Sequence, residues 1–146
     1  MTKKESTFSI FLIEDRDDDI DITREALNQA KKSCTLEVAK EGEEALKRLR
    51  EKVSDKRKSL PEMILLDLNL PKMDGQKVLE ELKDDDQLAP VPVIILTISK
   101  QDKDVARSYN SGAAGYITKP IDFSEFVKTI DVINQYWSIC QIPEQH

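Results

Sequence analysis

The most constraining feature of this sequence is a strict alternation between short apolar runs and longer segments with helical spacing of apolar residues. The short runs have the length and composition of buried strands, and they occupy residues 8–14, 34–39, 63–67, 91–97 and 115–118. The longer segments are predicted helices at residues 18–32, 41–53, 75–85, 101–112 and 122–140. Strands that alternate with helices predict an α/β fold, in which helices cover both faces of a parallel sheet.

Size and charge narrow the function classes. The 146 residues suit one domain, which we expect to span residues 1–146 with a short C-terminal extension from about residue 138. The net charge of -6 argues against nucleic acid or an anionic membrane as the main partner. No apolar segment approaches the ~20 residues that span a bilayer. Cys34 and Cys140 lie far apart without metal-ligand spacing, so we expect reduced thiols and a cytoplasmic protein.

The ends of the predicted strands carry polar groups that a parallel sheet brings together. Strand one ends at Glu14 and Asp15, strand three at Asp67, strand four at Thr97 and strand five at Lys119. All strands of a parallel sheet end at the same edge, and ligands bind in the crevice there. Each residue is ordinary alone, but three carboxylates, a hydroxyl and an amine at one edge predict a functional site.

Charge repulsion indicates what this site binds. Carboxylates held close together repel one another unless one is protonated or a cation lies between them. Oxygen ligands with open positions suit Mg²⁺ or Mn²⁺, and Mg²⁺ often shares a phosphate. We expect Asp67 to accept a phosphoryl group, with the metal and Lys119 spreading the charge and Thr97 donating a hydrogen bond. The acidic run at residues 17–19 is expected only to offset the positive end of the first helix.

Four motifs together resemble the receiver domain of two-component response regulators. They are FLIED, LLDLNLPKMDG, VIILT and GYITKP, and the resemblance covers residues 8–137. It implies a flavodoxin-like (βα)5 fold, a doubly wound parallel sheet with strand order 2-1-3-4-5. It also implies a signalling protein that is not an enzyme and that receives its phosphoryl group from a sensor histidine kinase.

The resemblance implies roles for the acidic residues. Asp67 is the phosphoacceptor, and Glu14 and Asp15 form the acidic pair beside it. The metal ion, Mg²⁺ or Mn²⁺, is expected at this pair, at Asp67 and at the backbone carbonyl of Asn69.

The remaining motif residues are expected to form the switch. By the same resemblance, Thr97 is the switch hydroxyl and Lys119 pairs with the phosphate. Tyr116 is the aromatic side chain that turns inward when the site is phosphorylated. A cis peptide is expected before Pro120, a residue type suited to that role.

One residue departs from the family pattern. The position after the switch hydroxyl is usually small, whereas here it is Ile98. A branched side chain at the rim is expected to narrow access to the phosphoryl group and to slow self-dephosphorylation. A lifetime of seconds rather than minutes for the aspartyl phosphate contradicts this expectation.

The last helix indicates how such a protein signals. Only a short tail follows Trp137, so we expect output through the receiver's own surface. Phe126 and Ile130 follow the spacing of a core face, whereas Val132, Tyr136 and Ile139 form a second apolar line. That line is either a set of tolerated surface residues or an interface, most simply with a second copy of the chain.

The combination of a basic loop before strand three and this last helix is similar to the stand-alone regulators of cyanobacterial phytochromes. That resemblance implies a phytochrome-type kinase as partner. It also implies a homodimer through the face formed by helix four, strand five and helix five, together with the C-terminal extension.

Two other functions are compatible with parts of this pattern. Haloacid-dehalogenase-like phosphatases also use an Asp nucleophile with Mg²⁺, but they need a second Asp where this chain has Asn69. The other alternative is a receiver-like interaction module that is never phosphorylated, although such modules usually lack an acid or the lysine. The only histidine is His146, which excludes a Ser-His-Asp triad and an internal His phosphodonor.

Overall fold

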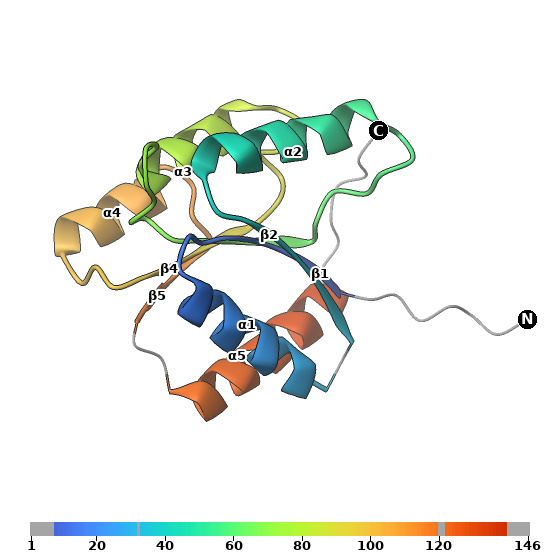
Figure 1. Cartoon of the computed structure of the whole chain (residues 1–146), viewed down its shortest axis with the longest axis vertical. Helices are drawn as coiled ribbons and strands as arrows, with labels where there is room; N and C mark the ends of the chain where they lie inside the picture. The colour runs from blue at the N-terminus through green and yellow to red at the C-terminus, as the bar shows by residue number, and fades with distance from the viewer. Residues whose placement is uncertain (1–7, 32, 120–121, 140–146) are drawn as a thin grey trace, which may run out of the picture.

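The computed structural model describes residues 8–31, 33–119 and 122–139, excepting the side chains of residues 137–139. Five parallel strands form one sheet in the predicted order β2-β1-β3-β4-β5 (Figure 1). The strands are β1 (Phe8–Ile13), β2 (Cys34–Ala39), β3 (Met63–Leu66), β4 (Val93–Thr97) and β5 (Gly115–Thr118). The helices are α1 (Asp17–Gln29), α2 (Gly42–Ser54), α3 (Gly75–Asp84), α4 (Asp102–Asn110) and α5 (Phe123–Ile139). The predicted α/β fold is confirmed.

Helices cover both faces of the sheet, with α1 and α5 on one side and α2, α3 and α4 on the other (Figure 1). Strands β3 and β4 are therefore buried at every position. Successive side chains of a strand point to opposite faces. Ile64 and Leu66 accordingly enter the core beneath α2 and α3, while Met63 and Leu65 enter the core beneath α1 and α5. The sheet is the shared wall of two apolar cores.

The burial of side chains in α1 and α5 tests the helical periodicity predicted from the sequence. In α5, Phe126 and Ile130 are buried, and the side chains of Val132 and Tyr136 are 63% and 56% exposed, so both predicted apolar lines are confirmed for these residues. In α1, helical spacing with Ala26 and Leu27 also predicts a core position for Ile22. That prediction is wrong, because Ile22 is 49% exposed and Ile20 is buried instead. The predicted cis peptide before Pro120 and the side chains of Trp137 and Ile139 lie outside the described residues.

Helix ends follow local sequence. The Asp74 side chain caps α3 by accepting a hydrogen bond from the Gln76 N–H at 2.7 Å. Gly112 follows α4 with φ of 102°, a left-handed conformation that glycine adopts without strain, and it confirms the predicted helix stop.

No helix in the described part of the chain is long and apolar enough to cross a bilayer.

The start of α3 packs closely against the backbone of Asp67 and Leu68. The Gly75 N–H donates to the Leu68 carbonyl at 3.0 Å. A Cβ atom at Gly75 would lie 2.4 Å from the Asp67 carbonyl oxygen and 2.5 Å from the Leu68 Cα. Both obstacles are backbone atoms, so no side-chain rotation relieves the overlap. Gly75 therefore fixes how closely α3 approaches the end of β3.

We expect Gly75→Ala to lower the free energy of unfolding by about 1 to 3 kcal/mol, because the added methyl group displaces backbone. Urea denaturation measures the change. Gly115→Ala is the matched control, since its Cβ would meet only Ile94 side-chain atoms at 3.6 and 3.7 Å. We expect the control to change the unfolding free energy by about 0.5 kcal/mol or less. Equal effects of the two substitutions contradict this account of Gly75.

Candidate functional site

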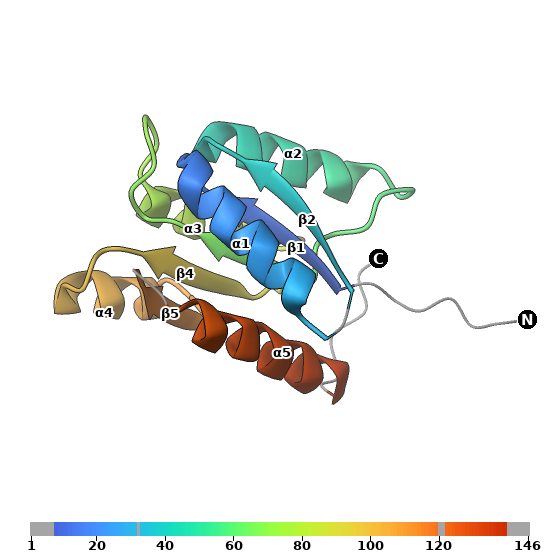
Figure 2. The same ribbon diagram turned by 60° about the horizontal axis from the view of Figure 1, so that its bottom comes forward.

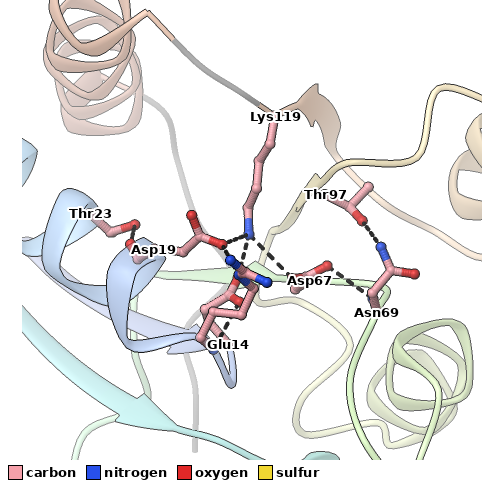
Figure 3. A network of polar contacts seen from close by, with 8 residues as sticks. Glu14, Asp19, Thr23, Asp67, Asn69, Thr97 and Lys119 are labelled. Atoms are coloured by element: carbon pink, nitrogen blue, oxygen red, sulfur yellow. Dashed lines mark hydrogen bonds and ion pairs between the residues drawn. The ribbon is translucent and has the colours of Figure 1, made fainter.

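The strand ends gather the predicted polar residues in one place (Figure 3). Glu14 follows β1, Asp67 follows β3, Thr97 ends β4 and Lys119 follows β5. Hydrogen bonds between adjacent chain segments fix three of these backbones. Glu14 N–H donates to Ala39 O at 3.1 Å, Asp67 N–H to Ile13 O at 3.0 Å, and Lys119 N–H to Thr97 O at 2.7 Å. The predicted juxtaposition of these four residues is present in the structure.

The Lys119 ammonium lies at the centre of this group. Its Nζ atom donates to Glu14 Oε2 at 2.6 Å, to Asp19 Oδ2 at 2.9 Å and to Asp67 Oδ2 at 3.2 Å (Figure 3). An ammonium group has three N–H donors, so each one is directed at a carboxylate. Lys119, Glu14 and Asp67 are all buried. One buried ammonium group therefore contacts three acidic side chains, two of them buried and Asp19 partly exposed.

The two buried carboxyls differ in their readiness to ionise. Burial raises the pKa of Glu14 to about 7, with Asp67 adding to the rise and Lys119 opposing it. Burial also acts to raise the pKa of Asp67, but the Asn69 N–H, Glu14 and Lys119 outweigh it and hold that pKa below its ordinary value. When two close carboxyls titrate together, the environment decides which carries the proton. A proton taken up by the pair below about pH 7 therefore goes to Glu14, and Asp67 stays ionised.

Asn69 connects Asp67 to the end of β4. Its backbone N–H donates to Asp67 Oδ1 at 2.9 Å, and its side-chain Nδ2 donates to Thr97 Oγ1 at 3.1 Å. Thr97 is fully buried. The Thr97 oxygen accepts from Asn69, and the Thr97 hydroxyl also helps to hold the pKa of Asp67 low, so its proton is directed toward Asp67.

A cavity of about 450 Å³ opens at these strand ends. Its lining consists of Asp15, Arg16, Asp19, Asp67, Asn69, Ile98 and Lys119. The predicted rim residue Ile98 does line it, with 65% of the side chain exposed. A larger hollow, of about 590 Å³, lies between α2 and α3 and contains none of these groups. The chemistry of the side chains, not the size of the hollow, marks the strand-end cavity as the functional one.

Comparison with known proteins identifies the family. The response regulator receiver domain matches residues 10–131, which is most of the chain. The chain belongs to this family.

The receiver is similar to several known proteins along most of its length. It is 36% identical over 91% of its residues to the "Probable methanogenesis regulatory protein FilR2" of Methanothrix harundinacea, covering 85% of that protein. It is 34% identical over 88% of its residues to the response regulator Rcp1 of Synechocystis sp., covering 87% of it. The crystal structure of the phosphorylated cyanobacterial phytochrome response regulator RcpA matches with 35% identity and a TM-score of 0.81, over 95% of the receiver and all of RcpA.

The acidic side chains of the receiver fit a divalent cation. Glu14, Asp15 and Asp67 each offer a carboxylate oxygen, and the three oxygens lie within 4.8 Å of one another. Hard oxygen donors of this kind suit Mg²⁺ and Mn²⁺. A solved structure of Rcp1, 32% identical over 93% of the receiver and 99% of that chain with a TM-score of 0.77, is described as its Mn²⁺-bound form. The donor set therefore fits the cation expected for this family.

Tyr116 lies outside the cavity but is tied to its rim. The ring packs against the core beneath α2 and α3, and the hydroxyl donates to the Ser99 carbonyl at 2.9 Å. Burial raises the pKa of this phenol, so it remains a donor at neutral pH. Ser99 in turn donates its hydroxyl to Asp104 of α4 at 2.5 Å. Tyr116 is therefore linked to α4 through the loop that follows Thr97.

Asp19 is the site residue that the sequence reasoning missed. It was assigned only to the positive end of α1, and it does lie in the first turn of that helix. Its carboxylate also points at Lys119 and lines the cavity (Figure 3). The only signal in the sequence was position, because α1 begins two residues after Asp15 and its first turn therefore lies near the strand-end edge. The acidic pair of the motif therefore has a third carboxylate beside it.

We expect Mg²⁺ to raise the free energy of unfolding of the receiver by about 1 to 3 kcal/mol when added at 10 to 100 times its dissociation constant. Asp15→Asn removes one ligand and should abolish most of this stabilisation. Thermal unfolding with Mg²⁺ or with EDTA measures it. Asp18→Asn, an exposed acid outside the cluster, is the control and should keep the full Mg²⁺ effect. Stabilisation that survives in Asp15→Asn contradicts the assigned ligand set.

Proposed function

We propose that this receiver acts as a single-domain response regulator that accepts a phosphoryl group on Asp67 from a phytochrome-type histidine kinase. The observation that carries this proposal is an ionised Asp67 held by Lys119 at the mouth of an open cavity. Because histidine kinases draw their phosphoryl group from ATP, we assign the reaction to the cytoplasm. We regard the protein as a signalling partner of the kinase, not as an enzyme acting on a separate substrate.

Each side chain has a defined part in the proposed transfer. An Asp67 carboxylate oxygen attacks phosphorus, an O–P bond forms, and the bond from phosphorus to the donor breaks. The donor leaves with that electron pair. Lys119 donates an N–H to a phosphoryl oxygen, and Thr97 donates its hydroxyl to another. A bound Mg²⁺, held by Glu14, Asp15, Asp67 and the Asn69 carbonyl, would neutralise negative charge that builds up on the phosphoryl oxygens.

The proposed switch follows from the loop after β4. A Thr97 hydroxyl drawn to the phosphoryl group displaces the residues that follow it, including Ser99. The Ser99 carbonyl holds the Tyr116 hydroxyl, and the Ser99 side chain holds Asp104 of α4. Phosphorylation would therefore reposition Tyr116 and α4 together, and it would change the surface over β5.

Similarity to RcpA favours a phytochrome-type kinase as the partner, because that match covers nearly the whole of both chains. FilR2 is about as similar to the receiver and is named for methanogenesis, not for phytochrome signalling. The proposal therefore names a class of histidine kinase as partner and no individual kinase. The phosphatase alternative is disfavoured by Asn69. A carboxamide cannot act as general acid and base, and here it is engaged with Thr97.

We expect incubation with Mg²⁺ and acetyl phosphate to add the mass of one phosphoryl group to the receiver. The adduct should be absent in Asp67→Asn and in EDTA, because the acceptor or the metal is then missing. Intact-mass spectrometry reads the result directly. No adduct on the wild-type protein, from acetyl phosphate or from a phytochrome-type kinase, would favour the interaction module that is never phosphorylated.

We further propose that the receiver forms a homodimer through α4, β5, α5 and the C-terminal extension. Strand β5 is at the edge of the sheet, and α4 and α5 lie beside it (Figure 2). Apolar side chains are exposed on both helices: Tyr109 of α4 is 49% exposed, and Val132 and Tyr136 of α5 are more so. A second copy is the occupant that would cover the same face on both subunits about a two-fold axis.

We expect Val132→Glu to weaken dimerisation about tenfold or more, because a two-fold axis places the new charges near each other without apolar cover. Sedimentation velocity over a concentration series, with and without acetyl phosphate, measures the change. Ile22→Glu on α1 makes a similar exchange of an exposed apolar side chain outside this face and should leave the dimer intact. A receiver that stays monomeric in both conditions contradicts the proposal.

A further inference from the structure

We propose that Asp19 is a positioning residue that holds Lys119 before phosphorylation and releases it when the phosphoryl group enters. The inference rests on the proposed phosphorylation of Asp67. It concerns the one carboxylate that contacts Lys119 but lies outside the cluster able to hold a metal ion, among the residues described. Asp19 would thereby set how readily the receiver takes up a phosphoryl group.

The hydrogen bonds of Lys119 make an exchange necessary. Its three N–H donors are all directed at carboxylates, at 2.6, 2.9 and 3.2 Å. A phosphoryl oxygen therefore gains a hydrogen bond from Lys119 only if an existing contact weakens. Phosphorylation converts Asp67 from a carboxylate into an acyl group bearing the phosphate, so its single contact passes to one phosphoryl oxygen. A second hydrogen bond from Lys119 to the phosphoryl group then requires Glu14 or Asp19 to yield. The contacts to Glu14 and Asp19 remain as competitors.

Burial decides which competitor yields. The Glu14 side chain is 1% exposed, and releasing it would leave a buried acid without its cation. The Asp19 side chain is 25% exposed and has a second cation nearby, Arg16 Nε at 3.4 Å. Solvent and Arg16 can therefore stabilise Asp19 after Lys119 has left. Asp19 is the contact that costs least to break.

Repulsion acts in the same direction. The Asp19 carboxylate lines the cavity that the phosphoryl group would enter. It lies outside the group of Glu14, Asp15 and Asp67, so it does not belong to the donor set whose charge a bound cation would neutralise. Two negative groups that compete for one ammonium disfavour each other. The charge of Asp19 should therefore oppose phosphorylation.

Release of Asp19 would also carry the signal into α1. The residue lies in the first turn of α1, where its backbone carbonyl accepts from Thr23 Oγ1 at 2.9 Å. The contact with Lys119 joins that turn to the end of β5. Its loss would loosen α1 on the face of the sheet opposite to Tyr116. Phosphorylation would then alter both helical layers, one through Tyr116 and one through Asp19.

The test compares phosphorylation rates of wild type, Asp19→Asn and Asp18→Asn, with Mg²⁺ and a series of acetyl phosphate concentrations. Intact mass gives the phosphorylated fraction over time. We expect Asp19→Asn to be phosphorylated roughly tenfold faster, the effect of one contact to a charged group. Asp18 is exposed, lies in the same helical turn and carries the same charge, so Asp18→Asn reproduces only the change in net charge and helix-end electrostatics. We expect it to remain within about twofold of wild type.

Two further readouts separate positioning from a general structural effect. At an ionic strength near 1 M the Debye length falls to about 3 Å, so a long-range charge effect disappears while the Asp19 effect persists. In ¹H–¹⁵N spectra, phosphorylation should shift the amides of Asp19 and Thr23 in wild type and in Asp18→Asn. The same shifts should be much smaller in Asp19→Asn, where the contact is already weakened.

Three outcomes overturn the inference: equal rates for the two variants, a slower Asp19→Asn, or an Asp19→Asn effect that vanishes at high salt. Urea unfolding midpoints of both variants near that of wild type are expected, and a large loss of stability confined to Asp19→Asn assigns a structural role instead. Failure of the wild-type protein to accept any phosphoryl group removes the proposed function itself. That result is distinguishable, because the Asp19 inference fails alone only when wild type is phosphorylated.

Discussion

The structure depends on one buried ammonium group that holds together the ends of three parallel strands and the first turn of α1. Lys119 contacts Glu14 and Asp19, which flank the start of α1, and Asp67, which follows β3. Burying acidic groups is costly unless they are paired, and one cation cannot balance them all. Burial raises the pKa of Glu14 to about 7, while the Asn69 N–H, Glu14 and Lys119 hold the pKa of Asp67 below its ordinary value. The site still has a deficit of positive charge. The same deficit is what a divalent cation would remove.

The sheet places this charge cluster between two helical layers, and each layer is connected to the cluster by different hydrogen bonds. On the α4 side, Ser99 joins Tyr116 to Asp104 by hydrogen bonds. On the α1 side, Asp19 reaches Lys119 directly. Both routes begin at strand ends, where side chains are fixed by the parallel register rather than by their neighbours in sequence. A change of charge at Asp67 would therefore alter side-chain contacts on both faces of the sheet.

The sequence was sufficient to predict the meeting of Glu14, Asp67, Thr97 and Lys119, because strand ends follow from the positions of the apolar runs. The strand order was predicted only from the resemblance to receivers. The sequence was insufficient for Asp19, since helical periodicity gives the face of a residue but not the reach of its side chain. The buried Gln76 was equally hidden. It donates to the Asp104 carbonyl and to Ser108 Oγ, and a polar residue between apolar ones gives no periodic signal of burial.

The hydrogen bonds from Gln76 to α4 help to decide which helix would move on phosphorylation. Within α4, Ser108 alone is buried, so the helix is attached mainly by hydrogen bonds rather than by apolar area. Hydrogen bonds contribute little net free energy each and can be exchanged for bonds to water, whereas lost apolar contacts cannot be replaced. Helix α5, with Phe126 and Ile130 in the core, is held in the opposite way. A displacement that began at Thr97 would therefore meet the least resistance in α4, and the exposed surface of that helix is where, in the proposed switch, a change at Asp67 would reach a partner.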